Sequence, residues 1–420
     1  MTFAPSRFAQ GLTVETAFDV LAVAKRLKAA GKDVIELQIG DSPFPSTAHA
    51  KAAAVAAVGT DQSHYCPSHG LPSFRASVAR FMGREFGVPV GPEHVVVTPG
   101  AKVLEQFFCE AVLNPGDSVL VFSPHFPTYG PNIERRGAQA WFVPLRQEHD
   151  FRPEPAHVER FLREAPRPRA IFLNSPHNPT GGVATLADLH AIADLIRGKD
   201  VYVMSDEPYC HMAWRERHHS LLECPGMIEQ TVGVYTFSKS YSMSGYRLGF
   251  GVTAPPLADL IGKLINTSLS CVPPIIQLAG EAALEKDDAE RDATMKLFRR
   301  KVEILVAELQ KVDGVKVAEP AGTFYVFPNV KAICDRLGIQ SHGLAMFLLE
   351  AADDKLGVAC LGGECFGAAG NGFLRFSCAE PDERLAQAVH FFAQAIQRPD
   401  RVAAFLAERP HFRLTATGQK

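Results

Sequence analysis

Lys239 belongs to a set of residues whose types and order along the chain could do chemistry together. Asn178 and Asp206 precede it, Arg247 follows eight positions later, and Arg375 lies far downstream. A lysine amine can bond to an aldehyde, a carboxylate can hold a protonated ring nitrogen, and guanidinium groups bind phosphates and carboxylates. The set could therefore hold pyridoxal phosphate together with an amino acid and loosen a bond at the Cα of that amino acid.

The ring of such a cofactor needs partners at its nitrogen, its phenolic oxygen and its face. Asp206 opposite the ring nitrogen would keep this nitrogen protonated, so that the ring withdraws electrons. The Tyr209 hydroxyl and the Asn178 amide could bind the phenolic oxygen, and Phe126 could stack on the ring. Taken singly, each residue also fits an ordinary role, such as a turn aspartate, a tight turn or a packed aromatic side chain. Only the combination favours a cofactor site.

A phosphate group needs cations and hydrogen-bond donors. Residues 100–102, Gly-Ala-Lys, follow a predicted strand and begin a predicted helix. Free N–H groups and the helix dipole favour an anion at such a point, although a glycine at a helix start is common. Further donors are the hydroxyl groups of Thr236 and Ser238 and the guanidinium group of Arg247.

Arg375 is a charged residue in the otherwise apolar predicted strand 373–376. A buried charge needs a partner, because an unpaired one is costly. One partner is a substrate α-carboxylate held by two parallel hydrogen bonds. The other is an internal salt bridge, and the sequence leaves both open.

The elements that must position these residues are short apolar runs separated by helical patterns. Continuous apolar runs are typical of a mostly parallel sheet covered on both faces, and patterns such as 186–197 suit crossover helices. The predicted strands are 34–39, 94–98, 118–122, 170–174, 201–204 and 232–236. Ligands bind beyond the carboxyl ends of strands in such sheets. Asn178, Asp206 and Lys239 each follow a predicted strand, so we expect them to lie together.

The pattern changes near residue 283. Residues 286–312 predict a long charged helix, followed by strands at 314–317, 324–327 and 373–376. We therefore predict an α/β fold with a large domain over 46–285 and a smaller α+β domain over 286–420. The N-terminal segment 1–45 is expected to pack on the small domain.

Composition excludes some classes of function. With 43 basic and 46 acidic residues among 420, the net charge of −3 gives no general attraction to nucleic acid or an anionic membrane. Nine cysteines without a Cys-x-x-Cys pair fit reduced thiols in a cytoplasmic protein. No signal peptide or membrane-spanning stretch is expected. His218 and His219 lack carboxylate or cysteine partners at ligand spacing, so they are interpreted as a solvated loop without a metal.

Several separated motifs together resemble the class I/II aminotransferases of fold type I, close to the aspartate aminotransferase group. The resemblance extends from Gly40 to Arg375 and thus over most of the chain. Its most specific parts are Asn-Pro-Thr-Gly at 178–181, Asp206 with Tyr209, and Ser-Lys at 238–239 with Arg247.

The resemblance implies a role for each matched residue. Lys239 would form a Schiff base with the cofactor and carry protons at the substrate Cα. Asp206 would pair with the ring nitrogen, and Asn178 and Tyr209 would bind the phenolic oxygen. The phosphate group would be bound by Gly100, Ala101, Lys102, Thr236, Ser238 and Arg247.

At the substrate side, the resemblance implies that Arg375 and Asn178 bind the amino acid and that Gly40 lets it approach the backbone. Tyr65 would reach the phosphate group in the neighbouring subunit, so a homodimer is expected, with the N-terminal segment contacting the partner subunit.

The activity implied by the resemblance is ping-pong transfer of an amino group between an L-amino acid and a 2-oxo acid. Aspartate or glutamate is one possible donor, with Lys102 as a second cation, and an aromatic donor is another. Phe126 stands where many aspartate enzymes have tryptophan. The alternatives are a pyridoxal-phosphate-dependent β-lyase on the same fold and a non-catalytic homologue that senses a ligand.

Overall fold

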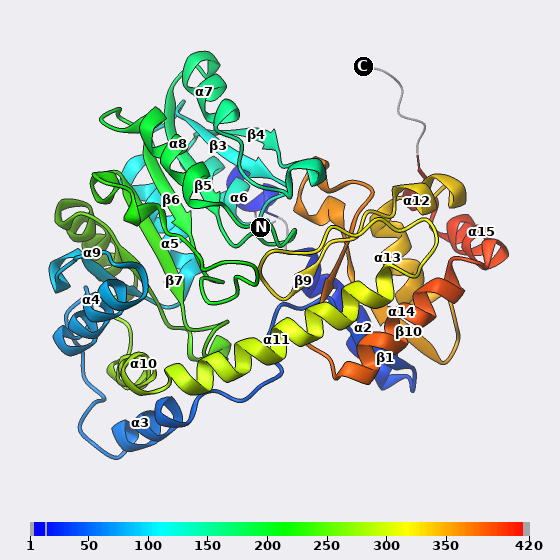
Figure 1. The fold of residues 1–420 in the computed structure, drawn as a ribbon, viewed down its shortest axis with the longest axis horizontal. Coiled ribbons are helices and arrows are strands. Elements are labelled where there is room, and N and C mark those ends of the chain that lie inside the picture. The colour runs from blue at the N-terminus through cyan, green and yellow to red at the C-terminus, as the bar shows by residue number, and fades with distance from the viewer. Residues whose placement is uncertain (1–3, 13–14, 415–420) are drawn as a thin grey trace.

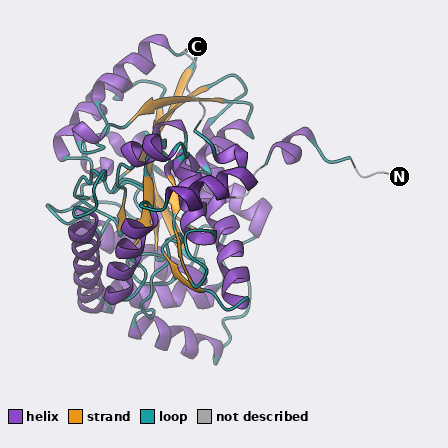
Figure 2. Ribbon diagram, turned by 90° about the vertical axis from the view of Figure 1, so that its right-hand side faces the viewer, coloured by secondary structure: helices purple, strands orange, loops and turns teal. Residues whose placement is uncertain are grey.

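The computed structural model describes residues 4–12 and 15–414 of the chain (Figure 1). Its largest feature is a seven-stranded sheet with helices on both faces (Figure 2). A second group of elements, with two small sheets, lies beside it at the right of Figure 1. This arrangement confirms the predicted α/β fold with a mostly parallel sheet and a smaller α+β part.

The large sheet has the strand order β2-β8-β7-β6-β5-β3-β4. The strands from β7 to β4 are parallel to one another, whereas β8 is antiparallel to both of its neighbours. The bounds are β2 Val95–Thr98, β3 Ser118–Ser123, β4 Gln139–Pro144, β5 Pro168–Asn174, β6 Tyr202–Asp206, β7 Thr231–Thr236 and β8 Gly249–Val252. Strands β3 and β5 to β7 are almost wholly buried, as their continuous apolar runs predicted.

Two strands of this sheet were not predicted. β4 lies at the edge of the sheet and is largely exposed, so it lacks a continuous apolar run. β8 contains Gly249 and Gly251, whose missing side chains leave room for the neighbouring backbone and for Leu104. A pattern of buried side chains cannot reveal a strand of either kind.

Helices cover both faces of the large sheet. One face packs on α5, α6 and α9, and the other on α4, α7 and α8. In α5 the buried residues Leu104, Phe107, Phe108 and Val112 form one apolar stripe at helical spacing. The bounds in this part are α3 Ala48–Val58, α4 Pro72–Phe86, α5 Ala101–Val112, α6 Tyr129–Glu134, α7 Pro155–Glu164, α8 Leu186–Ile196, α9 Pro255–Leu269 and α10 Pro274–Lys286.

The second group of elements combines both ends of the chain. Strand β1 pairs in parallel with β10, and β12 pairs with both β11 and β9. The long helix α11 runs from α10 toward this group (Figure 1). The strand bounds are β1 Asp33–Glu36, β9 Tyr325–Val326, β10 Leu356–Ala359, β11 Leu361–Gly362 and β12 Leu374–Ser377. The helix bounds are α1 Arg7–Gly11, α2 Thr16–Ala29, α11 Asp288–Leu309, α12 Lys331–Leu337, α13 Ser341–Glu350, α14 Asp382–Ala395 and α15 Pro399–Glu408.

Two strand predictions need correction. The run 34–39 was grouped with the strands of the large sheet, but β1 pairs with β10 outside that sheet. The predicted strand 314–317 is wrong, because this segment makes only an isolated bridge between Lys316 and Asn329. Apolar runs predict an extended conformation, but they do not specify a partner. The domain boundaries at residues 45 and 285 stay a prediction.

The described residues contain no helix that is both long and apolar enough to cross a membrane. They also contain no cluster of three or more histidine, cysteine or acidic side chains that could hold a metal ion.

Candidate active site

A cavity of about 500 Å³ opens where the carboxyl ends of β5, β6 and β7 face the second group of elements. Most of the residues predicted to form a site line this cavity. They are Gly40, Ala101, Lys102, Phe126, Asn178, Asp206, Tyr209, Thr236, Ser238, Lys239, Arg247 and Arg375. Two predicted residues, Gly100 and Tyr65, are not among the residues that line it. The tertiary structure thus brings together residues from almost the whole length of the chain.

Lys239 follows β7 and extends its amino group into the cavity. Its Nζ donates a hydrogen bond of 2.5 Å to the carbonyl oxygen of Gly40. The same nitrogen lies 5.9 Å from the ring centre of Tyr209 and 5.8 Å from that of Phe324. A side chain at position 40 would not fit here, because a Cβ would lie 1.8 Å from the Tyr325 hydroxyl oxygen. Gly40 therefore keeps the backbone open opposite the lysine.

Asp206 ends β6 and is buried at the floor of the cavity. The Tyr129 hydroxyl donates a 2.5 Å hydrogen bond to Oδ2, whereas Oδ1 has no hydrogen-bond partner among the described residues. Burial raises the pKa of Asp206 to about 7, the Tyr129 hydrogen bond opposes this, and the charge of Glu207 adds to it. A protonated ring nitrogen offers the N–H donor and positive charge that Oδ1 lacks. The residues present therefore fit the pyridine ring of pyridoxal phosphate.

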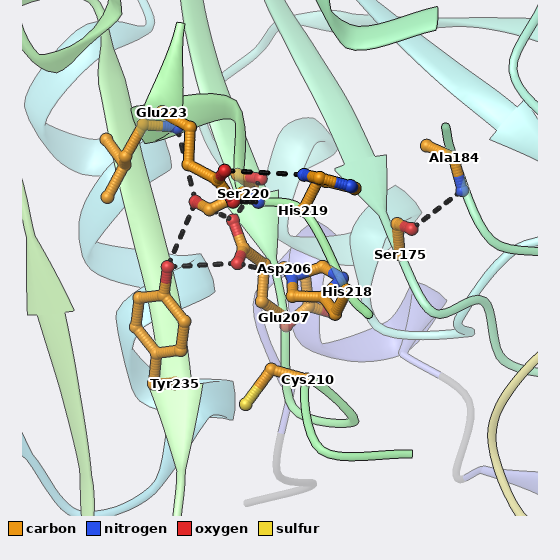
Figure 3. A network of polar contacts seen from close by, with 12 residues as sticks. Ser175, Ala184, Asp206, Glu207, Cys210, His218, His219, Ser220, Glu223 and Tyr235 are labelled. Carbon is orange, nitrogen blue, oxygen red and sulfur yellow. Dashed lines mark hydrogen bonds and ion pairs between the residues drawn. The ribbon is translucent and has the colours of Figure 1, made fainter. Parts of the chain in front are cut away.

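Behind Asp206 lies a network of polar side chains that sequence reasoning missed (Figure 3). The buried carboxylate of Glu207 accepts hydrogen bonds of 2.7 Å from both Ser205 and Ser220. Tyr235 donates to it at 2.9 Å, and the Nε2 of His218 lies 2.8 Å from it. None of these four partners of Glu207 lines the cavity, so the network anchors the end of β6 next to Asp206.

His218 was interpreted as part of a solvated loop, and this interpretation is wrong. Its side chain is 1% exposed and pairs with Glu207. The loop folds inward because an otherwise isolated buried carboxylate needs donors. The one signal in the sequence was the acidic pair Asp206-Glu207 at the end of an apolar strand, since two adjacent carboxylates there require separate partners.

Arg375 is buried in β12 and its guanidinium group is held in a fixed position. Its Nη2 donates a 2.6 Å hydrogen bond to the carbonyl oxygen of Gln38, and its Nη1 donates a 3.1 Å bond to Oδ1 of Asn178. The group also lies 4.3 Å from the ring centre of Tyr325. In the described part of the chain, no carboxylate pairs with Arg375 and its buried Nε is unbonded. The alternative of an internal salt bridge is therefore wrong, and a positive charge faces the cavity.

Tyr209, which was also predicted to belong to the site, lines the cavity. It is buried, and its hydroxyl oxygen lies 3.1 Å from that of Tyr325.

A second group of donors gathers at the N-terminus of α5. Gly100 has φ +85°, and a Cβ there would lie 2.4 Å from Nη2 of Arg247. Ala101 starts the helix, so its N–H group and the next ones have no partner within the helix. The hydroxyl oxygens of Thr236 and Ser238 lie 2.9 Å apart on the same side. This arrangement of amides, hydroxyls and a guanidinium group suits a phosphate group.

Lys102 lines the cavity and has a charged partner, whereas Tyr65 is not among the lining residues. Lys102 forms an ion pair with Glu15, which precedes α2, and its Nζ lies 5.4 Å from the ring centre of Phe126. Lys102 thus has a partner within the chain, and its side chain is 45% exposed. Tyr65 is 87% exposed on the surface of this chain.

Comparisons with known proteins identify the family of this chain. The sequence model of the family described as aminotransferase class I and II matches residues 32–392. The chain is 31% identical to an aspartate aminotransferase from Pyrococcus horikoshii, over 87% of this chain and 91% of that protein. It is also 31% identical to the arginine–pyruvate transaminase AruH of Pseudomonas aeruginosa, over 85% of this chain and 88% of that protein. The solved structure of Thermus thermophilus aspartate aminotransferase with maleate superposes with a TM-score of 0.87, at 30% identity, over 94% of this chain and 100% of that one.

Proposed function

Since the chain belongs to the class I and II aminotransferases and is a pyridoxal-phosphate-dependent enzyme acting on amino acids and 2-oxo acids, we propose that the cavity around Lys239 is its active site. One observation carries this proposal. A buried carboxylate oxygen without a partner among the described residues, Oδ1 of Asp206, lines the same cavity as the amine of Lys239. A pyridine ring with an aldehyde group would satisfy both residues at once.

When bound, the cofactor supplies an electron-poor ring that accepts the electron pair of the broken Cα–H bond. Lys239 would hold the cofactor at its aldehyde group. Its Nζ would also take the proton from the substrate Cα. Asp206 would hold a proton on the ring nitrogen, because its Oδ1 has no other donor among the described residues.

The remaining contacts would fix the cofactor in place. Asn178 and Tyr209 would bind the phenolic oxygen, and Phe126 would cover one face of the ring. The phosphate group would be bound at the start of α5 by Gly100, Ala101, the backbone N–H of Lys102, Thr236, Ser238 and Arg247.

Arg375 would bind the α-carboxylate of the amino acid, with Asn178 beside it and Gly40 leaving room for the substrate. The buried and hydrogen-bonded guanidinium group supports this role, because it presents an uncompensated charge in a fixed orientation. Binding at Arg375 would align the Cα–H bond with the amine of Lys239.

We also propose a homodimer in which Tyr65 binds the phosphate group in the partner subunit. Tyr65 is 87% exposed in a single chain, and Val55 and Val58 on α3 are 75% and 70% exposed. In addition, the short helix α1 extends away from the body of the chain (Figure 2). Apolar and aromatic groups exposed in this way are typical of a surface that a partner covers.

Mixed dimers test this shared site. A Lys239→Ala chain and a Tyr65→Ala chain should each be impaired alone. Mixed together, they should regain activity, because one of the two sites then holds both native residues. Failure of the mixture to exceed either parent would refute the shared site.

Absorption spectra test the proposed site and the reaction together. The purified protein is titrated with single amino acids in the absence of a 2-oxo acid. We expect some amino acids to convert the cofactor band to that of the amine form, with one 2-oxo acid released per site. A Lys239→Ala variant should bind cofactor without this conversion. Ammonia release without the amine form would instead indicate a lyase.

A further inference from the structure

The proposed reaction uses all but one of the cationic side chains that line the cavity. Within the described part of the chain, the cationic side chains lining the cavity are Lys102, Lys239, Arg247 and Arg375. The proposed function uses Lys239 for the cofactor aldehyde, Arg247 for the phosphate group and Arg375 for the α-carboxylate. Only Lys102 remains to bind a second carboxylate on the side chain of a substrate.

Lys102 is not free for that purpose, because the chain provides its own counterion. The carboxylate of Glu15 contacts the ammonium group of Lys102, although the two residues lie 87 positions apart. Glu15 itself lines the cavity, and its side chain is 19% exposed. The Lys102 side chain is 45% exposed, so the pair lies at the mouth of the cavity, partly open to solvent.

A second acidic side chain, Glu105, lies nearby, but burial raises its pKa well above the usual range. Glu105 lies on the same helix as Lys102, one turn further along, and is 2% exposed. It also lines the cavity and accepts a 2.5 Å hydrogen bond from the Thr128 hydroxyl. The negative charge that a substrate carboxylate would meet beside Lys102 is therefore that of Glu15.

The other residues at this end of the cavity are mostly apolar. Ala17 and Phe18 follow Glu15 in the chain, and Phe126 lies against Lys102. These side chains offer contact area and no hydrogen-bonding groups. They suit a substrate side chain that is aromatic or aliphatic and carries no charge.

We propose that Glu15 is a specificity-determining residue, which occupies Lys102 and excludes amino acids and 2-oxo acids that carry a second carboxylate. The substrates of this enzyme are then amino acids with uncharged aromatic or aliphatic side chains. This inference rests on the proposed function, since it takes Arg375 as the site of the α-carboxylate. The exclusion follows from charge, because a dicarboxylate must either displace Glu15 or bind beside it.

Calorimetric titration of the holoenzyme with two unreactive acids tests this role. Maleate is a small dicarboxylate, and 3-phenylpropanoate is an aromatic monocarboxylate. The native enzyme should bind 3-phenylpropanoate more tightly than maleate. In Glu15→Gln, maleate binding should become about tenfold tighter or more, because the variant frees Lys102 and removes a like charge. Binding of 3-phenylpropanoate should change by less than about twofold, because its uncharged ring does not need the ammonium group of Lys102 as a partner.

Two further variants make the result specific. Glu148→Gln removes the same charge from an exposed carboxylate that does not line the cavity, and it should leave both affinities unchanged. Adding Lys102→Met to Glu15→Gln should abolish the gain in maleate affinity. Maleate binding that is equal in the native enzyme and in Glu15→Gln would overturn the role of Glu15.

Arg375→Ala separates this inference from the proposed function. It should weaken the binding of both acids, because each has a carboxylate for this guanidinium group. If 3-phenylpropanoate binds Arg375→Ala as tightly as the native enzyme, the assigned site is wrong and the inference about Glu15 falls with it. If only the Glu15→Gln result fails, the assigned site stands and the role of Glu15 alone is refuted.

Discussion

Asp206 is expected to reduce the stability of the cofactor-free protein, because its buried carboxylate lacks the partner that the cofactor would provide. Its side chain is buried, one of its oxygens has no partner among the residues described, and its pKa is raised from 3.8 to about 7. Between these two pH values, the folded state binds one proton that the unfolded state does not. Stability therefore falls as the pH rises through this range, and the full cost is present above about pH 7.

The magnitude follows from the two pKa values. A pKa of 3.8 in the unfolded state and about 7 in the folded state lowers the free energy of unfolding. The loss is about 4 kcal/mol at pH 8 and about 2 kcal/mol at pH 5. Asp206→Asn keeps the shape and accepts the Tyr129 hydrogen bond, but it carries no charge at either pH. The variant should thus be more stable than the native cofactor-free protein. For 420 residues, an unfolding entropy of about 0.9 kcal/mol/K converts the gain at pH 8 to about 4 °C in Tm.

Differential scanning calorimetry of the cofactor-free proteins at pH 8 and pH 5 measures this effect. Asp206→Asn should melt higher than the native protein, with the larger difference at pH 8. Adding pyridoxal phosphate should reverse the order, because only the native carboxylate stabilises the protonated ring nitrogen. The exposed Asp313 provides the control, and Asp313→Asn should shift Tm at neither pH. If Asp206→Asn melts at or below the native temperature at pH 8, the reasoning about the buried charge is refuted.

Three other substitutions probe the remaining contacts of the site. Lys239→Ala should leave the fold intact and abolish the spectral conversion by amino acids, so conversion in this variant would remove Lys239 from its assigned role. Arg375→Ala should weaken amino-acid binding between about 30-fold and about 4,000-fold, since a buried hydrogen-bonded charge contributes about 2–5 kcal/mol. Cofactor affinity should change little, and equilibrium titrations of both ligands check the contrast. Gly40→Ala should weaken amino-acid binding because its Cβ would lie 1.8 Å from the Tyr325 hydroxyl oxygen. Adding Tyr325→Phe should restore part of this affinity, and no restoration would contradict the proposed clash.

Much of the fold could be predicted because its signals are local. Runs of buried apolar residues predicted β3, β5, β6 and β7, and the pattern after residue 283 predicted the helix that forms α11. Asn178, Asp206 and Lys239 could be placed together because parallel strands end at the same edge of a sheet. The exposed edge strand β4 and the glycine-interrupted strand β8 gave no such signal, so both were missed.

The candidate site was predicted by residue type, but its contacts were not. The sequence could not tell whether Arg375 pairs with an acid, and the structure surrounds it with Asn178, Gln38 and the ring of Tyr325. Nor could the sequence show that His218 is buried against Glu207. Each of these contacts depends on how separate elements pack, which local patterns do not encode.

Local sequence patterns were enough to predict the class of fold, the edge of the sheet at which a ligand is expected, and the set of groups available for chemistry. These follow from side-chain periodicity and residue type, which act over a few neighbouring residues. Only the tertiary structure decided which charges are compensated. Lys102 meets Glu15 across 87 positions, whereas Oδ1 of Asp206 and the guanidinium group of Arg375 face the cavity without a charged partner in the described chain. Electrostatic energy depends on distance and burial in space, so the folded arrangement decides which of these groups can bind a ligand.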